Sequence, residues 1–217
     1  FREFLAWIVA ADKKCLMIGN TNAITYKEVF PLIKENRLWL GNGFHKGNAY
    51  FRPVGDREYV AGVKDAETGL VKFRNCCWFT NLDHGRRHQP LILMTEADNV
   101  RYSRHKEIRG AGYAHYDNYD AIEVPYVDAI PSDYDGAMGV PITFLDKYCP
   151  EQFEIIGRGG DIEWAENECD FYTPPTAENS ALYKKYDRTW RIQNPYILND
   201  KGKPQTIYQR LLIRRLK

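Results

Sequence analysis

The first apolar residues of the chain recur with the spacing of one face of a helix. They occupy the i, i+3, i+4, i+7 and i+8 positions, as Phe1, Phe4, Leu5, Ile8 and Val9. This spacing predicts an amphipathic helix. We expect it to end near residues 12–14, where two lysines suit the negative end of a helix dipole.

Short apolar runs alternate with a further helical pattern over the next residues. Cys15–Ile18 is entirely apolar and is closed by Gly19-Asn20, which predicts a strand buried on both faces, as in a parallel sheet. Leu38–Leu40 predicts another strand. Between them, Thr25–Glu28 matches a capping box, although the helix can instead begin with Pro31 at its first position. The order helix, strand, helix, strand is typical of an α/β layer domain.

Further strands are predicted along the rest of the chain. A weak hairpin spans Tyr50 to Lys72 and turns at Asp65–Gly69. Other predicted strands are Cys76–Asn81, Leu91–Met94, one within Asn118–Val127, Phe153–Gly157 and Thr206–Ile213. Near residue 95 the sequence becomes polar, Tyr-rich and turn-rich, so we predict two domains, residues 1–95 and 96–217.

Composition excludes several classes of protein. The 217 residues are 44% hydrophobic and 14% aromatic, which is enough for a core and unlike a disordered chain. No window approaches the ~18 apolar residues of a membrane span. The 5 cysteines form no C-x-x-C pair, which argues against a disulfide framework or a zinc ribbon and favours the cytoplasm. Arg2 and Glu3 do not fit a signal peptide, and the first residue is Phe, so we expect an internal start.

Charge is unevenly distributed, although the formal net charge is only +1. Residues 183–217 hold ten Lys or Arg against two Asp, with Tyr and Trp between them. Residues 117–136 hold six Asp or Glu and no Lys or Arg. A basic stretch interleaved with aromatic residues is typical of a surface that follows nucleic-acid phosphates. A solvated face that balances the acidic segment remains the alternative.

Several short motifs do not support a catalytic role. Neither Gly110–Gly112 nor Gly157–Gly160 has the strand and helix context of a phosphate-binding loop. Methyltransferases that act on amino groups use an (Asp/Asn/Ser)-Pro-Pro-(Tyr/Phe) turn beside the flipped base. Thr173–Thr176 has the two prolines without the ends, and Asn194–Tyr196 lacks one proline. We predict that the two glycine-rich and the two proline-containing segments are loops without a catalytic role.

Longer stretches of the sequence resemble a known family. Five segments, spread over most of the chain, are similar to the EcoRI-type adenine-specific DNA methyltransferases: Ile18–Asn36, Trp78–His84, Tyr116–Val124, Gly139–Tyr148 and Tyr208–Ile213. Strings of this length are far more specific than a short pattern. The resemblance implies transfer of a methyl group from S-adenosylmethionine to the exocyclic N6 of adenine in duplex DNA.

The resemblance also implies which part of such an enzyme the chain represents. In the family the catalytic Asn-Pro-Pro-Phe turn directly precedes a segment similar to Phe1–Phe4, and the cofactor loop lies earlier. We therefore expect residues 1–95 to be the second half of a class I, Rossmann-like sheet, and residues 96–217 to be an α+β target-recognition region with the closing strand. No catalytic residue is then expected in this chain, and S-adenosylmethionine is bound mainly by the N-terminal half.

Expected partners follow from the same resemblance. Duplex DNA is the substrate, and no membrane is involved. An incomplete α/β sheet exposes an edge and an apolar face, so the N-terminal half or a second copy of the chain is expected to associate with it.

The resemblance and the chain order together give candidate site residues. A flipped adenine is held between aromatic faces, and Phe79, with Trp78 in reserve, matches the position of the second face. Asn20 and Asn22 follow a strand at its carboxyl end, where open α/β sheets bind ligands, so they are expected to line the cofactor or adenine pocket. The alternatives are two core rings and two turn-forming asparagines.

Candidate DNA contacts form three groups. They are Arg86, Arg87 and His88; Tyr116, Asn118 and Tyr119; and Lys184, Lys185, Arg188 and Arg191. Two other functions remain open. A non-catalytic DNA-binding module derived from such an enzyme predicts salt-dependent binding of duplex DNA without the cofactor. A small-molecule enzyme predicts no affinity for DNA.

Overall fold

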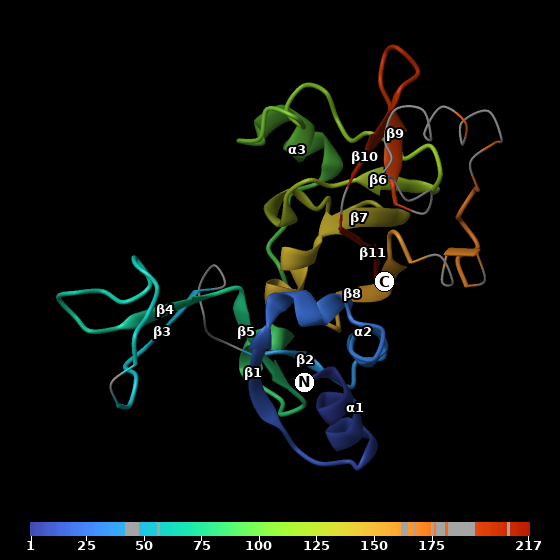
Figure 1. The fold of residues 1–217 in the computed structure, drawn as a ribbon. Helices are drawn as coiled ribbons and strands as arrows, with labels where there is room; N and C mark the ends of the chain where they lie inside the picture. Colours follow the sequence, from blue (N-terminus) through green and yellow to red (C-terminus); the bar gives the residue numbers. More distant parts are fainter. Residues whose placement is uncertain are drawn as a thin grey trace. The chain divides into compact units, whose positions relative to one another are not determined.

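The computed structural model describes residues 1–217 except 42–47, 56, 162–164, 167, 175, 177–180, 182–193 and 208. The chain forms two compact units, residues 1–87 and residues 88–217 (Figure 1). Both contain helices and small sheets, so the fold is mixed α/β. Within the described residues, no helix has the length and apolar character needed to cross a membrane.

Unit 1 is built around a three-stranded sheet. Its elements are α1 (Arg2–Ala10), β1 (Leu16–Asn20), the 3-10 helix η1 (Thr21–Thr25), α2 (Phe30–Lys34), β2 (Trp39–Leu40), β3 (Asn48–Phe51), β4 (Val71–Arg74) and β5 (Cys76–Thr80). The strand order is β1-β5-β2, and β5 is antiparallel to both neighbours. The two outer strands therefore run in the same direction, with α2 in the connection between them.

The predicted opening helix and the first predicted strand are confirmed as α1 and β1, but the expected burial of that strand on both faces is wrong. Leu5 and Val9 of α1 are buried, as the apolar spacing requires. In β1, however, Leu16 is 56% and Ile18 39% exposed, and the strand is antiparallel to its neighbour β5. The all-apolar run therefore has one exposed face, because no second layer covers that side among the described residues.

The helix after β1 begins at the later of the two predicted positions. α2 starts at Phe30 with Pro31 in its first turn, where the missing amide hydrogen costs nothing. Thr25 does not begin this helix, because the N-cap of α2 is Val29. The Thr25 hydroxyl instead donates to the carbonyl oxygen of Asn22, 2.9 Å away, at the end of η1.

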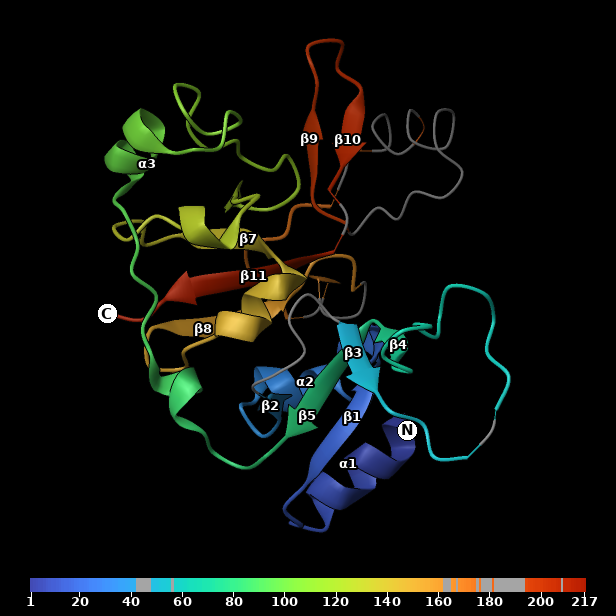
Figure 2. The same ribbon diagram turned by 90° about the vertical axis from the view of Figure 1, so that its left-hand side faces the viewer.

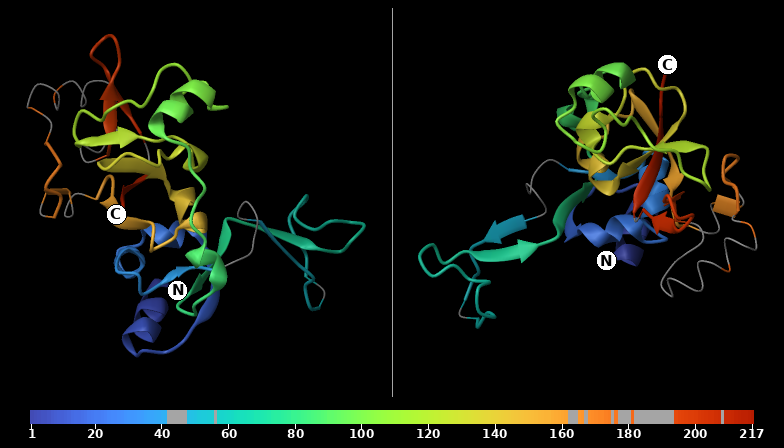
Figure 3. Two further views of the ribbon diagram at one scale, coloured as in Figure 1. Left: turned by 180° about the vertical axis from the view of Figure 1, so that it is seen from behind. Right: turned by 90° about the horizontal axis from the view of Figure 1, so that it is seen from above.

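The predicted hairpin is confirmed. β3 pairs with β4 in an antiparallel register, from Asn48 opposite Arg74 to Phe51 opposite Val71. The far turn is closed by Asp65, whose carboxylate accepts hydrogen bonds from the amide and the hydroxyl of Thr68, both at 2.7 Å. Figure 3 shows this hairpin standing away from the β1-β5-β2 sheet.

Unit 2 is built around a four-stranded sheet. Its elements are α3 (Glu96–Tyr102), β6 (Ala121–Glu123), the 3-10 helices η4 (Val127–Ala129) and η5 (Ile142–Lys147), β7 (Ala137–Pro141), β8 (Phe153–Arg158), β9 (Tyr196–Leu198), β10 (Pro204–Thr206) and β11 (Arg210–Arg215). The order is β6-β7-β11-β8, with β6 parallel to β7 and β11 antiparallel to both neighbours. Figure 2 shows β11 between β7 and β8.

The strands predicted within Asn118–Val127 and at Phe153–Gly157 are confirmed as β6 and β8. The last predicted strand is divided, because Gln209 adopts a φ of 50° between β10 and β11. The strand predicted at Leu91–Met94 is wrong. The Gln152 side chain provides the hydrogen bonds that a neighbouring strand would provide. Its Oε1 accepts from the Leu91 amide at 2.7 Å, and its Nε2 donates to the Leu91 carbonyl at 3.0 Å.

Candidate functional site

The carboxyl end of β1 carries the two predicted pocket asparagines, and both are exposed. The Asn20 side-chain oxygen accepts from the backbone nitrogen of Asn22 at 2.9 Å and caps η1. Asn20 is therefore a turn-forming residue in this structure. Between them, the Thr21 hydroxyl is buried and has no hydrogen-bond partner among the described residues. This end of the strand thus offers one unsatisfied hydroxyl.

The two candidate stacking residues differ sharply in exposure. Phe79 is 0% exposed, and its ring meets Phe1 edge to face, with 5.4 Å between the ring centroids. Gly19 lies against both rings, because a Cβ at this position would come within 3.0 Å of each of them. Trp78 is half-buried and lies opposite Ile18 across the β1–β5 pair. Trp78 is therefore the more accessible of the two candidates.

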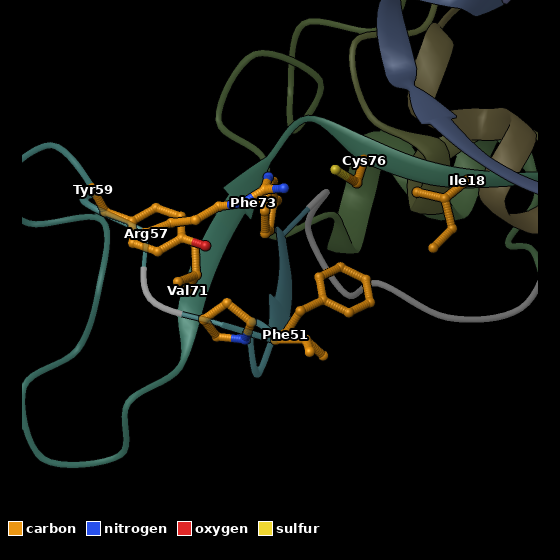
Figure 4. Close-up of a pocket in the computed structure, with 9 residues that line it drawn as sticks. Ile18, Phe51, Arg57, Tyr59, Val71, Phe73 and Cys76 are labelled. Atoms are coloured by element: carbon orange, nitrogen blue, oxygen red, sulfur yellow. The ribbon is translucent and has the colours of Figure 1, made fainter.

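A cavity of about 450 Å³ lies between the β3–β4 hairpin and the sheet of unit 1 (Figure 4). It is lined by Ile18, Phe51, Pro53, Val54, Arg57, Tyr59, Val71, Phe73 and Cys76. The volume is within the range of pockets that hold small molecules, roughly 300–1,000 Å³. The wall is apolar and aromatic except for the guanidinium of Arg57. Such a lining suits a ligand with a flat ring and a nearby negative charge.

The hairpin beside this cavity exposes aromatic and cationic side chains together. Phe51 and Phe73 are 38% and 46% exposed, and their ring centroids lie 5.6 Å apart. Tyr50 is 56% exposed, and the Lys72 ammonium lies 5.8 Å from its ring centroid. Aromatic faces beside cations are the surface that single nucleobases and phosphates prefer. Sequence reasoning missed this site, although β4 alternates aromatic and basic residues in Lys72-Phe73-Arg74 and β3 ends in the aromatic pair Tyr50-Phe51.

The predicted contacts around residue 87 have mainly structural partners. Arg87 is 8% exposed, and its guanidinium lies 3.7 Å from the Trp39 ring centroid. It donates to the Asp83 carboxylate at 3.4 Å and to the side-chain oxygen of Asn36. Arg87 therefore links the turn after α2 and the strand β2 to residue Asp83 near the end of unit 1. Arg86 beside it is half-buried.

His88 is exposed and belongs to unit 2. Its Nδ1 lies 2.6 Å from the Glu151 carboxylate. Hydrogen bonds from the Cys149 thiol and from His88 lower the pKa of Glu151 despite the opposing effect of burial. His88 is thus already held by a carboxylate.

Tyr116, Asn118 and Tyr119 lie in the interior of unit 2, at 6%, 0% and 2% exposure. The Tyr116 hydroxyl donates to Glu123. The Asn118 amide donates to the carbonyl of Asn194 at 3.0 Å and accepts from the amide of Tyr196. The Tyr119 ring packs against that of Tyr172, 5.0 Å between centroids. All three side chains make contacts inside unit 2 and are not exposed at its surface, where a DNA contact would have to lie.

The remaining predicted contacts, Lys184, Lys185, Arg188 and Arg191, lie outside the described residues. The acidic segment 117–136 acts within the fold. Asp117 accepts from the amide of Leu198 at 2.7 Å, and Asp133 accepts from the amide of Glu96 at 2.7 Å, at the start of α3. These two carboxylates cap backbone groups of the surrounding loops and helix.

The comparisons with known proteins find one family model and several type II methyltransferases. The sequence model of the family described as adenine-specific methyltransferase EcoRI matches residues 1–216. The type II methyltransferase M.EcoRI of Escherichia coli is 45% identical over 159 residues, which are 72% of this chain and 46% of the relative. M.MpnI of Mycoplasma pneumoniae is 35% identical over 161 residues, 72% of this chain and 47% of the relative.

M.MgeORF184P of Mycoplasma genitalium is 31% identical over 164 residues, 72% of this chain and 48% of the relative. No solved structure matches the chain. The chain spans about half the length of these curated relatives. Since the family model covers almost every residue, the chain belongs to the EcoRI family of adenine-specific methyltransferases.

Proposed function

We propose that this chain is part of a DNA methyltransferase that transfers a methyl group from S-adenosylmethionine to the N6 atom of adenine in duplex DNA. The observation that carries this proposal is the family match over residues 1–216. All three curated relatives are named type II methyltransferases. An enzyme of this kind works where the DNA is, so we place it in the cytoplasm.

The topology of unit 1 supports the proposed class I, Rossmann-like sheet. β1 and β2 run parallel, are joined through α2, and are separated by the antiparallel β5. Doubly wound sheets often carry an antiparallel strand near one edge. The β1-β5-β2 sheet is then the closing end of a larger sheet, and β1 is the strand on which the rest of that sheet continues.

We propose that most of the site for S-adenosylmethionine lies on a companion segment of the enzyme. At the carboxyl end of β1, the Asn20 oxygen is committed to a turn, and the Thr21 hydroxyl is one unsatisfied polar group. One hydroxyl cannot hold a cofactor with an amino acid, a ribose and a base. We therefore assign most of the cofactor site, and the catalytic turn, to a companion segment of the enzyme.

The exposed apolar face of unit 1 fits that companion segment. Phe4 and Trp7 of α1 are 55% and 64% exposed, and their rings stack with 6.2 Å between centroids. Leu16 and Ile18 of β1 are also exposed, and β1 pairs only with β5 among the described residues. A free strand edge beside exposed apolar side chains marks a surface that another segment covers.

Within the enzyme, unit 1 is proposed to hold the target base. Trp78 is the better supported stacking residue, because Phe79 has no exposed surface. The cavity beside Phe51 and Phe73 offers further aromatic faces close to the same sheet. Arg86, His88 and the basic segment from Lys184 to Arg191 remain proposed phosphate contacts.

A non-catalytic DNA-binding module is the alternative. It is favoured by the hairpin, where Tyr50, Phe51 and Phe73 are exposed beside Lys72, and by the incomplete cofactor site. The two proposals differ in one respect. Only the methyltransferase acquires cofactor binding and methyl transfer when the companion segment is supplied.

The proposed function is tested with a chimaera in which this chain replaces the similar segment of M.EcoRI. Tritium transfer from labelled S-adenosylmethionine to an adenine-containing duplex is the expected result. The alternative predicts a chimaera that folds and binds duplex DNA but transfers no label.

A further inference from the structure

A cluster of cations in unit 2 begins in the last turn of α3 and continues into the loop after it. Residues 101–109 read Arg-Tyr-Ser-Arg-His-Lys-Glu-Ile-Arg, with four Lys or Arg and one Glu. The four cationic side chains, Arg101, Arg104, Lys106 and Arg109, are all exposed. We name residues 101–109 the basic loop.

The backbone of the basic loop is held in place from both ends. Ser103 is 2% exposed, and its hydroxyl accepts from the amide of His105 at 3.1 Å. Ile108 is 1% exposed and fixes the middle of the turn. The amide of Gly110 donates back to the carbonyl of Val100 in α3 at 2.8 Å. The cations therefore project from a scaffold that is already ordered, which reduces the entropy lost on binding.

One acidic residue neutralises only part of the loop. Asp128 pairs with Arg104 at 2.6 Å and with His105 at 3.0 Å, and the His105 ring stacks on Tyr126, 3.6 Å between centroids. Within the part of the chain that the structure describes, Lys106 and Arg109 have no side-chain ion pair or hydrogen bond. Their charges are thus available to an external anion.

The aromatic residue of the loop extends the same surface. Tyr102 is 60% exposed, and the Arg101 guanidinium lies 5.1 Å from its ring centroid. A cation and a flat ring side by side fit the phosphate and the sugar of a nucleic-acid backbone. Ile108 is turned into the core, so the loop does not offer the apolar groove that a peptide partner would need.

We propose that the basic loop binds the phosphate backbone of duplex DNA, with Lys106 and Arg109 as direct phosphate contacts and Arg101 and Tyr102 beside them. This rests on the proposed function, since it names a second DNA-contacting surface of the same enzyme. Contacts of this kind fix the position of the protein on the duplex without reading its sequence.

The test is the salt dependence of duplex binding by the full chain, measured by fluorescence anisotropy without cofactor. Each phosphate contact contributes about 0.9 to the slope of log affinity against log salt. The double variant Lys106→Gln, Arg109→Gln is therefore expected to lower the slope by about 2 and to weaken binding equally for unrelated sequences. The matched control is Lys13→Gln, Lys14→Gln, which removes two exposed cations from unit 1.

Lysine acetylation gives an independent readout on the unaltered chain, because bound duplex is expected to protect Lys106 and to leave Lys13 reactive. An unchanged slope, an equal fall in the control variant, or no duplex binding by the chain would overturn the proposal, as would preferential binding of duplex RNA. None of these measurements uses methyl transfer, so a failure of the catalytic proposal remains distinguishable.

Discussion

Arg210 on β11 forms an ion pair with Glu123 on β6, and the pair crosses over the intervening strand β7. The Arg210 Nη2 lies 2.6 Å and its Nε 3.0 Å from the Glu123 carboxylate oxygens, and both side chains are largely buried. Tyr116 donates to the same carboxylate. The crossing is permitted by Gly139 on β7, where a Cβ would overlap the Tyr116 hydroxyl.

Removing one partner of this pair is expected to destabilise unit 2 strongly. Glu123→Gln removes the carboxylate that faces the buried Arg210 guanidinium, and loss of one partner of a buried ion pair typically costs about 3–5 kcal/mol. Urea denaturation should show a fall of this size in the free energy of unfolding. Arg214→Gln on the same strand is the control, because its ion pair with Glu154 is 45% and 46% exposed and worth about 0–1 kcal/mol.

Gly139→Ala is expected to destabilise unit 2 by overpacking. The added Cβ would meet the Tyr116 ring as well as its hydroxyl, and the ring is fixed by the buried Glu123. Overpacking of this kind costs about 1–3 kcal/mol. Thermal denaturation should show a lower Tm, whereas Gly85→Ala, where a Cβ meets nothing within 4 Å, should leave the Tm unchanged. A stable Gly139→Ala variant would contradict the assigned packing.

Alkaline pH is expected to unfold unit 2. Burial raises the pKa of Tyr172 to about 12 from its usual 10.0, with smaller contributions from nearby charges. Burial, and after it the charge and hydrogen bond of Glu123, raises the pKa of Tyr116, and burial also raises that of Tyr119. Above about pH 10 the unfolded chain binds fewer protons than the folded chain, so the free energy of unfolding falls as pH rises.

The stabilisation from these tyrosines is thus complete below about pH 10 and declines toward pH 12. Phenolate absorbance and circular dichroism should change together in an alkaline titration. Ionisation of these tyrosines near pH 10 with the circular dichroism intact would show that they are not buried as described.

Phe73→Ala is expected to weaken several-fold the binding of a duplex with an unpaired adenine, because stacking of an unstacked base on an aromatic ring is worth about 1–3 kcal/mol. Phe73 lines the cavity beside Phe51 and is 46% exposed, so its loss should leave the Tm nearly unchanged. Val60→Ala, an 81% exposed apolar residue that does not line the cavity, is the control. Equal affinities of the two variants, measured by anisotropy, would remove the hairpin from the DNA-binding surface.

The sequence predicted elements whose signal is local. The amphipathic spacing of Leu5 and Val9 and the turn at Asp65 depend on neighbours a few residues away, and both are confirmed. The exposure of Leu16 was not predictable, because apolar character alone does not show whether a second layer is present. The strand prediction for Leu91–Met94 was wrong for a related reason, since the backbone of Leu91 bonds the side chain of Gln152, which is distant in the sequence.

The sequence did not show which of the candidate site residues are buried. Polar and aromatic residues in a segment similar to the family suggest DNA contacts, yet Asn118 and Tyr119 are buried in the interior of unit 2. Burial depends on long-range packing, such as the contacts of Asn118 with Asn194 and Tyr196. The basic loop was overlooked because four cations in nine residues resemble any solvated turn until the structure shows their partners.

The most direct test of the central claim is nucleoside analysis of DNA treated with the M.EcoRI chimaera that carries this chain. Duplex DNA is incubated with S-adenosylmethionine, digested to nucleosides and separated by chromatography. N6-methyladenine is the expected methylated product, and none of it is expected with either part alone. A chimaera that folds and binds DNA but leaves adenine unmethylated would contradict the assignment of this chain to an adenine methyltransferase.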